Sequence, residues 1–216
     1  MFYRKIEEKL RDYYKNDNDR IIIVTGARQI GKSFIIRETA KTYFKNYIEI
    51  NMQEDKDGDE YFKDVKTTKD FYLQLSALYG EKLNDIKDTI VFIDEIHNVI
   101  KAGGAEGAID ASNILKPYLS RNQIQLIGAT TEDEFQQIFE KDKALKRRFQ
   151  VIKVLPSSIE ETRQILYKIK NIYENFYSLK IDNEVLDYIV ELTSRCLPNY
   201  YFPDKAIDTL DNACVI

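Results

Sequence analysis

The sequence has few of the residues that build metal centres or disulfide frameworks. Its 216 residues include no tryptophan, four prolines, one histidine and two cysteines. One histidine makes no metal site, and the spacing of Cys196 and Cys214 matches no metal-binding pattern. We expect both cysteines to be buried free thiols in a reducing cytoplasm.

The sequence also lacks the long apolar runs that membrane proteins need. No run approaches the roughly 20 apolar residues of a membrane span, and the charged N-terminus contains no apolar core of a signal peptide. About 44% of the residues are hydrophobic and 31% are charged, which is typical of a soluble globular domain. Membrane, secreted, collagenous and disordered classes are therefore excluded, and we expect a cytoplasmic protein.

An excess of positive charge is absent as well. The 32 Lys and Arg residues are outnumbered by 36 Asp and Glu residues, which gives a net charge of −4. This balance argues against a protein held to nucleic acid by a general basic surface, although it leaves a local basic patch open. The length corresponds to one large domain, or to a domain with a small appendage.

Five short apolar or β-branched runs alternate with segments of helical periodicity. This alternation predicts an α/β domain with a parallel sheet and helices on both faces. After Leu155 the strand signals stop, and three helical stretches begin at a Ser-x-x-Glu capping box on Ser158, at Asp182 and at Pro203. We therefore predict an α/β domain over residues 1–155 and a helical subdomain over residues 156–216. The five runs are Arg20–Thr25, Tyr47–Asn51, Thr89–Asp94, Gln123–Ala129 and Gln150–Leu155.

The segment after the first predicted strand matches the phosphate-binding pattern G-x-x-x-x-G-K-[ST]. Its glycines allow backbone N–H groups to surround phosphate oxygens, and the predicted helix after it presents its N-terminus to the anion. Lys32 would contact the β- and γ-phosphates of ATP, and the Ser33 hydroxyl would bind Mg²⁺. The predicted nucleotide-binding residues are Gly26, Ala27, Arg28, Gln29, Ile30, Gly31, Lys32 and Ser33.

Two carboxylates follow the third predicted strand. Asp94 would hold Mg²⁺, directly or through water, and Glu95 would act as the general base that polarises the attacking water. His97 comes two residues later and could orient groups near this site, although a structural or surface role is the alternative. Arg147 and Arg148 precede the fifth strand; they are either solvated surface or donors of positive charge to a neighbouring subunit.

From the third strand onward, the sequence resembles the first ATPase module of the Clp-type AAA+ unfoldases, the ClpA/ClpB/ClpC group. The resemblance covers approximately residues 90–216. The matching segments are Val91–His97, Gly104–Ala111, Asn113–Pro117, Leu126–Thr131, Glu140–Asp142, Arg147–Gln150 and Pro203–Asp208.

The upstream part, approximately residues 1–97, resembles a different group, the bacterial and archaeal P-loop ATPases with a Gly-x-Arg-Gln-x-Gly-Lys loop. Gly26–Lys32 matches that loop, and the Ile50-Asn51 strand end is followed by an acidic loop as in that group. The two patterns overlap at the strand that ends in Asp94-Glu95. A join between them at this strand leaves every predicted catalytic element in place.

The Clp resemblance implies an AAA+ fold with a five-stranded sheet and a helical lid, and a ring, expected to be a hexamer, that uses ATP and Mg²⁺ to remodel or unfold a protein substrate. Thr131 resembles the sensor that reads the γ-phosphate, and Arg147 and Arg148 resemble arginine fingers that act on the adjacent protomer. Lys205 lies in the lid motif near the nucleotide. Gly104–Ala108 resembles the secondary pore loop.

One part of the Clp pattern is missing. The primary pore loop of that group carries an aromatic residue in a Tyr-Arg-Gly-like motif, and Tyr61-Phe62-Lys63 is the nearest aromatic segment without matching it. An alternative function is therefore a nucleotide-gated binding module, or a switch ATPase of the Gly-x-Arg-Gln group, with weak hydrolysis and no threading. A DNA-acting ATPase is a third class, which the charge does not favour.

Overall fold

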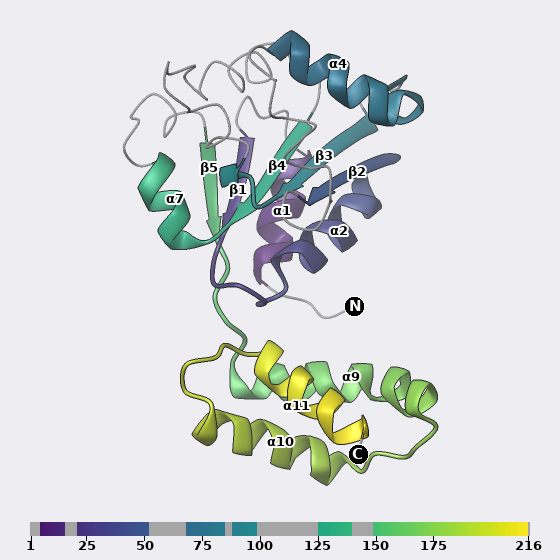
Figure 1. Cartoon of the computed structure of the whole chain (residues 1–216), viewed down its shortest axis with the longest axis vertical. Helices are drawn as coiled ribbons and strands as arrows, with labels where there is room; N and C mark the ends of the chain where they lie inside the picture. Colours follow the sequence, from purple (N-terminus) through teal and green to yellow (C-terminus); the bar gives the residue numbers. More distant parts are fainter. Residues whose placement is uncertain are drawn as a thin grey trace. The chain divides into compact units, whose positions relative to one another are not determined.

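The computed structural model describes residues 5–15, 21–51, 68–84, 88–98, 125–139 and 149–215. The chain forms two compact units (Figure 1). One comprises Tyr3–Thr25 and Lys32–Lys153, and the other comprises Val154–Ile216 together with the segment Gly26–Gly31. We call them the α/β unit and the helical unit. The exact domain boundary that the sequence suggests, between residues 155 and 156, stays a prediction.

Among the described residues, the α/β unit contains one sheet of five parallel strands in the order β2-β3-β4-β1-β5. The predicted α/β fold with a parallel sheet is confirmed. Thr25 pairs with Thr130, and Asn51 pairs with Asp94, so the carboxyl ends of these strands lie at the same edge. The strands are β1 (Ile21–Thr25), β2 (Asn46–Asn51), β3 (Thr89–Asp94), β4 (Gln125–Thr130) and β5 (Phe149–Lys153).

The strands β1 and β3 are buried along almost their whole length. Continuous burial is expected for parallel strands, because helices cover both faces of the sheet. Helix α1 packs against α2, where the ring of Tyr14 contacts Tyr43 and Phe44 at centroid distances of 5.6 and 5.2 Å. The helical elements of this unit are α1 (Lys5–Lys15), α2 (Lys32–Tyr43), α4 (Thr68–Tyr79), the 3₁₀ helix η1 (Gly80–Asn84) and α7 (Glu132–Phe139).

The described helices of the helical unit are α9 (Ile159–Tyr177), α10 (Asn183–Cys196) and α11 (Asp204–Val215). The predicted capping box is present at the start of α9. The N–H of Glu161 donates to the Ser158 hydroxyl at 3.2 Å, and the N–H of Ser158 donates to the Glu161 carboxylate at 2.7 Å. The helices pack around an apolar core formed by Leu166, Ile181, Leu186, Ile189, Val190, Phe202, Ala206 and Leu210.

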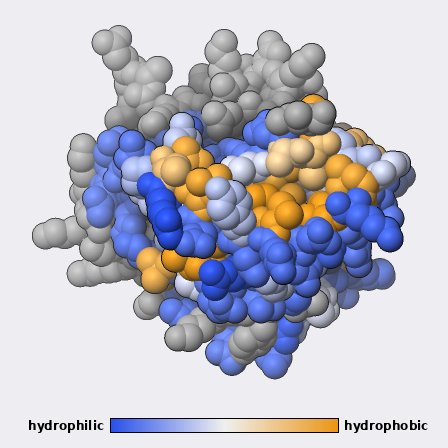
Figure 2. Space-filling model, turned by 90° about the horizontal axis from the view of Figure 1, so that it is seen from below, coloured by the Kyte–Doolittle hydropathy of each residue, from blue (hydrophilic) through white to orange (hydrophobic). Residues whose placement is uncertain are grey.

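The surface of the helical unit is mixed, and two of its details differ from expectation. Ile172 and Phe176 are exposed on α9, and Figure 2 shows apolar side chains among polar ones on the face seen from below. Cys196 is exposed and Cys214 half-buried, so the predicted burial is wrong for Cys196, because α10 ends there. Asp182 takes the N-cap position of α10 in an extended conformation, without a side-chain capping bond.

Within the described ranges, we find no helix whose length and hydropathy would let it cross a membrane.

Candidate functional site

The predicted phosphate loop connects β1 to α2 and has an unusual backbone. Gly26, Gln29 and Gly31 have positive φ angles of 156°, 61° and 84°. A Cβ atom on Gly26 would lie only 2.5 Å from the carbonyl oxygen of Val154, so glycine is required there. Helix α2 begins at Lys32, which is buried. Backbone turns of this kind, followed by a helix N-terminus, form anion-binding sites in proteins.

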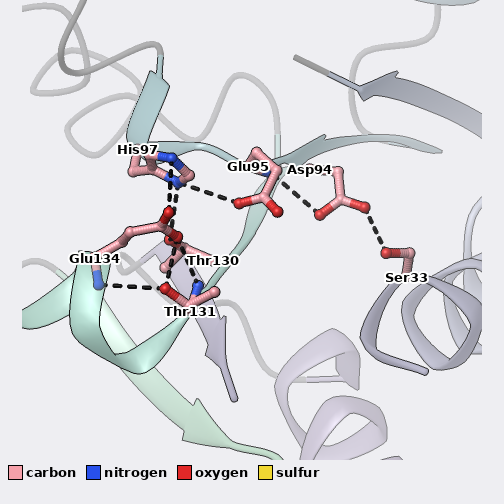
Figure 3. A network of polar contacts seen from close by, with 7 residues as sticks. All are labelled: Ser33, Asp94, Glu95, His97, Thr130, Thr131 and Glu134. Carbon is pink, nitrogen blue, oxygen red and sulfur yellow. Dashed lines mark hydrogen bonds and ion pairs between the residues drawn. The ribbon is translucent and has the colours of Figure 1, made fainter. Parts of the chain in front are cut away.

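Ser33 and Asp94 come together, as the sequence predicts. The Ser33 hydroxyl, in the first turn of α2, donates a hydrogen bond of 2.5 Å to Oδ2 of Asp94 at the end of β3 (Figure 3). The other carboxylate oxygen of Asp94 accepts the backbone N–H of Glu95 at 3.0 Å. A hydroxyl and a carboxylate are hard oxygen donors, the type that Mg²⁺ prefers. The two side chains therefore fit the predicted magnesium ligands.

Glu95 lies in a tight turn directly after β3. Its φ angle is 53°, a left-handed conformation that is rare for residues other than glycine and that occurs often at functional sites. The turn is held by hydrogen bonds from Ile96 N–H to the Ala129 carbonyl, at 3.0 Å, and from Asn98 N–H to the Glu95 carbonyl, at 2.9 Å. A Cβ atom on Gly128 would lie 2.6 Å from the Ile96 side chain, so close packing under the turn also depends on a glycine.

His97 lies between two carboxylates from different elements. Its Nδ1 is 3.2 Å from Oε2 of Glu95, and its Nε2 is 3.3 Å from Oε1 of Glu134 on α7 (Figure 3). His97 as a whole is 4% exposed, so the alternative of a surface residue is wrong. The hydroxyl of Thr130 is 3.1 Å from Nδ1 and donates to Glu134 at 3.3 Å.

The predicted sensor Thr131 forms a helix cap in this structure. Its hydroxyl donates to Oε2 of Glu134 at 2.6 Å and accepts the backbone N–H of Glu134 at 3.3 Å. The N–H of Thr131 also points to this carboxylate, at 3.3 Å. Its role as a sensor stays a prediction. Sequence reasoning missed Glu134 and Thr130, although Thr131-x-x-Glu134 has the pattern of a capping box.

The environment of Glu134 stabilises its charged form. Partial burial raises the pKa of this carboxyl group, but hydrogen bonds from Thr131 and Thr130 and the proximity of His97 outweigh that effect. The net result is a lowered pKa, so Glu134 is ionised at neutral pH.

Lys205 is a buried cation in the helical unit. Its Nζ donates to the carbonyl of Leu197 at 2.9 Å and lies 4.3 Å from the ring centroid of Phe202. Burial lowers its pKa. Its predicted role at the nucleotide stays a prediction.

Several predicted functional residues lie outside the described part of the chain. They are Arg147, Arg148, the segment Gly104–Ala108 and the aromatic segment Tyr61–Lys63. Their predicted roles therefore stay predictions.

Comparisons with protein families agree with this geometry. Residues 18–163 match the model of an AAA domain, and residues 158–216 match that of an AAA lid domain. The chain belongs to the AAA family. The predicted AAA+ fold with a C-terminal helical lid is confirmed.

Individual relatives of this AAA module are Clp proteins. It is 38% identical over 195 residues to the ATP-dependent Clp protease ATP-binding subunit ClpC of Staphylococcus epidermidis, covering 88% of the chain and 24% of the relative. It is 49% identical over 133 residues to the chaperone protein ClpB of Oceanobacillus iheyensis, covering 62% and 16%. The chain thus spans a quarter or less of these relatives. The Clp resemblance is confirmed, and the first alignment is long enough to reach upstream of Asp94.

Among solved structures, the AAA module is similar to Hsp104. The Hsp104–ADP complex of S. cerevisiae aligns with a TM-score of 0.73 at 30% identity, covering 99% of this chain and 37% of that one. A closed state of Hsp104 with ATPγS and FITC-casein aligns with a TM-score of 0.72, also at 30% identity, covering 99% and 38%.

Proposed function

We propose that the AAA module binds ATP with Mg²⁺ and hydrolyses it. The observation that carries this proposal is the 2.5 Å contact between Ser33 and Asp94, with Glu95 directly after Asp94. Two oxygen donors that can bind a cation therefore lie at the end of β3. A carboxylate that can activate a water molecule lies directly beside them. Hydrolysis of a nucleoside triphosphate needs this combination.

Each group has a defined task in the proposed reaction. The backbone N–H groups of Gly26–Gly31 and the cation of Lys32 hold the phosphates. Ser33 and Asp94 would hold Mg²⁺, which when bound neutralises phosphate charge. Glu95 accepts a proton from the attacking water, so that oxygen attacks phosphorus as the bond to the leaving diphosphate breaks.

We further propose that the protein works as a homo-oligomeric ring, a hexamer, in the cytoplasm and remodels a protein substrate. Support comes from the names of relatives, which include a chaperone protein ClpB and a Clp protease subunit, and from the Hsp104 structure with FITC-casein. In such a ring, Arg147 and Arg148 would donate positive charge to the nucleotide of the adjacent copy.

The first experiment measures ATPase rate against protein concentration, with oligomer size determined with and without ATP. We expect the specific activity to rise cooperatively as the protein assembles. Arg148→Ala or Arg147→Ala should remove that rise and leave nucleotide binding intact. A flat, negligible rate with intact binding would instead favour a nucleotide-gated binding module.

A second experiment tests the site itself. Glu95→Gln should lower turnover by at least about 100-fold, the lower range for loss of a general base, with nucleotide affinity unchanged. Lys32→Ala should weaken nucleotide binding. Survival of turnover in Glu95→Gln would show that the catalytic assignment is wrong.

A further inference from the structure

His97 is positioned to connect the proposed general base to a second, fixed carboxylate. Nδ1 lies 3.2 Å from Oε2 of Glu95 and 3.1 Å from the Thr130 hydroxyl, and Nε2 lies 3.3 Å from Oε1 of Glu134. Carboxylate oxygens accept hydrogen bonds and do not donate them. Glu95 shares Nδ1 with the Thr130 hydroxyl, and its contact with the ring is at an ion-pair distance.

Burial strengthens this bridge. The His97 side chain is 6% exposed, so both contacts lie largely out of water, where electrostatic attraction is stronger. Each of the residues Glu95, His97 and Glu134 offers one ligand atom within 4.8 Å of the other two, so the set resembles a metal site. Because the carboxylates lie on opposite ring nitrogens, however, the arrangement suits a bridging imidazole better than a chelate around one ion.

The Glu134 end of the bridge is held firmly. Its carboxylate accepts the Thr131 hydroxyl at 2.6 Å and the Thr131 N–H at 3.3 Å, and its own N–H donates back to Thr131. This reciprocal pair caps α7, so moving the carboxylate would break the side-chain half of the cap. His97 is thereby anchored on one side by a secondary-structure element.

The Glu95 end belongs to the catalytic group. We propose that His97 is a positioning residue: through Nδ1 it holds the carboxylate of Glu95, and it is itself held through Nε2 by Glu134 at the capped start of α7. This inference rests on the proposed role of Glu95 as general base. It follows that the orientation of the Glu95 carboxylate depends on Thr131 and α7, and not on β3 alone.

The test compares steady-state ATPase kinetics of His97→Ala, His97→Gln and Glu134→Gln in the full chain with Mg²⁺. We expect kcat to fall by roughly 10- to 100-fold in His97→Ala, the range for residues that orient a functional group, while KM and nucleotide affinity stay within about twofold. His97→Gln keeps one N–H donor and should recover part of kcat. Glu134→Gln should lower kcat alone.

Glu132→Gln is the matched control. It is the same chemical change two residues away on α7, at a side chain that pairs with Lys153 outside this network, and it should leave kcat unchanged. The double variant His97→Ala/Glu134→Gln should be no slower than His97→Ala, because both members act in one chain of contacts.

Distinct outcomes separate this inference from the proposed function. Turnover that survives Glu95→Gln overturns the proposed base and this inference with it. Turnover that stops in Glu95→Gln but persists at the wild-type rate in His97→Ala overturns only the positioning role. If His97→Ala does not fold, Glu134→Gln and His97→Gln decide: a loss of kcat that parallels a loss of nucleotide affinity and melting temperature would mean that His97 serves stability alone.

Discussion

The two units place their polar groups in different ways. The core cluster of the helical unit is formed by apolar side chains such as Leu166 and Leu186, and its helices are closed by local hydrogen bonds such as the Ser158 cap. In the α/β unit, the strand ends carry the buried His97 and the left-handed Glu95. Local strain and buried polar groups cost stability, so a left-handed glutamate in contact with a buried histidine at the end of a strand points to a functional role.

The largest effect on stability is expected in the core of the helical unit. Leu166 is fully buried there, so Leu166→Ala removes apolar contacts and leaves a cavity. We expect a loss of about 2–5 kcal/mol, measured by chemical denaturation. Ile172→Ala on the same helix is the control, since Ile172 is 66% exposed and should stay within about 0.5 kcal/mol of wild type. Equal effects would contradict the core assignment.

The next effect concerns the phosphate loop. Gly26→Ala would bring Cβ to 2.5 Å from the Val154 carbonyl oxygen. Overpacking of this kind costs about 1–3 kcal/mol. When the nucleotide-binding conformation of the loop carries this cost, nucleotide affinity falls roughly 5- to 150-fold. Titration with a fluorescent nucleotide measures it. Gly80→Ala is the matched control, because nothing lies within 4 Å of its added Cβ; wild-type affinity in both variants would refute the loop geometry.

Local sequence patterns predicted the helical unit well, because its features depend on neighbours along the chain. The Ser158 capping box and the start of α11 after Pro203 were predicted from the sequence, since caps act within one helical turn. The motif Gly26–Ser33 likewise predicted a loop between a strand and a helix. The contact of Ser33 with Asp94 was predicted because both follow parallel strands whose carboxyl ends share one edge.

The network around His97 could not be predicted in the same way. It joins residues from the end of β3, the end of β4 and the start of α7, and only strand pairing brings them together. The left-handed conformation of Glu95 has no sequence signal, because glutamate seldom adopts it. The exposure of Cys196 was missed because average burial of cysteine says nothing about a position at a helix end.

The two capping boxes allow a comparison with a smaller expected effect on stability. Ser158→Ala should cost about 0.5–2 kcal/mol of stability, the usual range for loss of an N-cap, with kcat unchanged. Thr131→Ala removes the corresponding cap of α7 and should lower both stability and kcat, because it releases Glu134. Denaturation and ATPase assays on both variants separate the two. Equal kcat values would show that the cap of α7 has no link to catalysis.

The smallest effect concerns an ion pair in the α/β unit. Arg37 donates two hydrogen bonds to Glu49, at 2.8 and 2.6 Å. Partial burial raises the pKa of Glu49, but hydrogen bonds from Arg37 and Tyr47 outweigh it, so the net pKa is lowered. A carboxyl group whose pKa is lowered by folding adds stability above its ordinary value of about 4.3, and that stability is lost as the pH falls through the lowered pKa.

Arg37→Gln should therefore reduce stability at pH 7, by up to about 1 kcal/mol for a pair this accessible. Its difference from wild type should narrow as the pH falls below about 4.3, where Glu49 becomes protonated in the variant and in the unfolded state. Urea denaturation at a series of pH values measures this. Arg195→Gln removes the exposed pair with Glu191 on α10 and should have a smaller effect at pH 7. A pH-independent difference for Arg37→Gln would mean that the guanidinium stabilises the α/β unit through packing and not through the charge of Glu49.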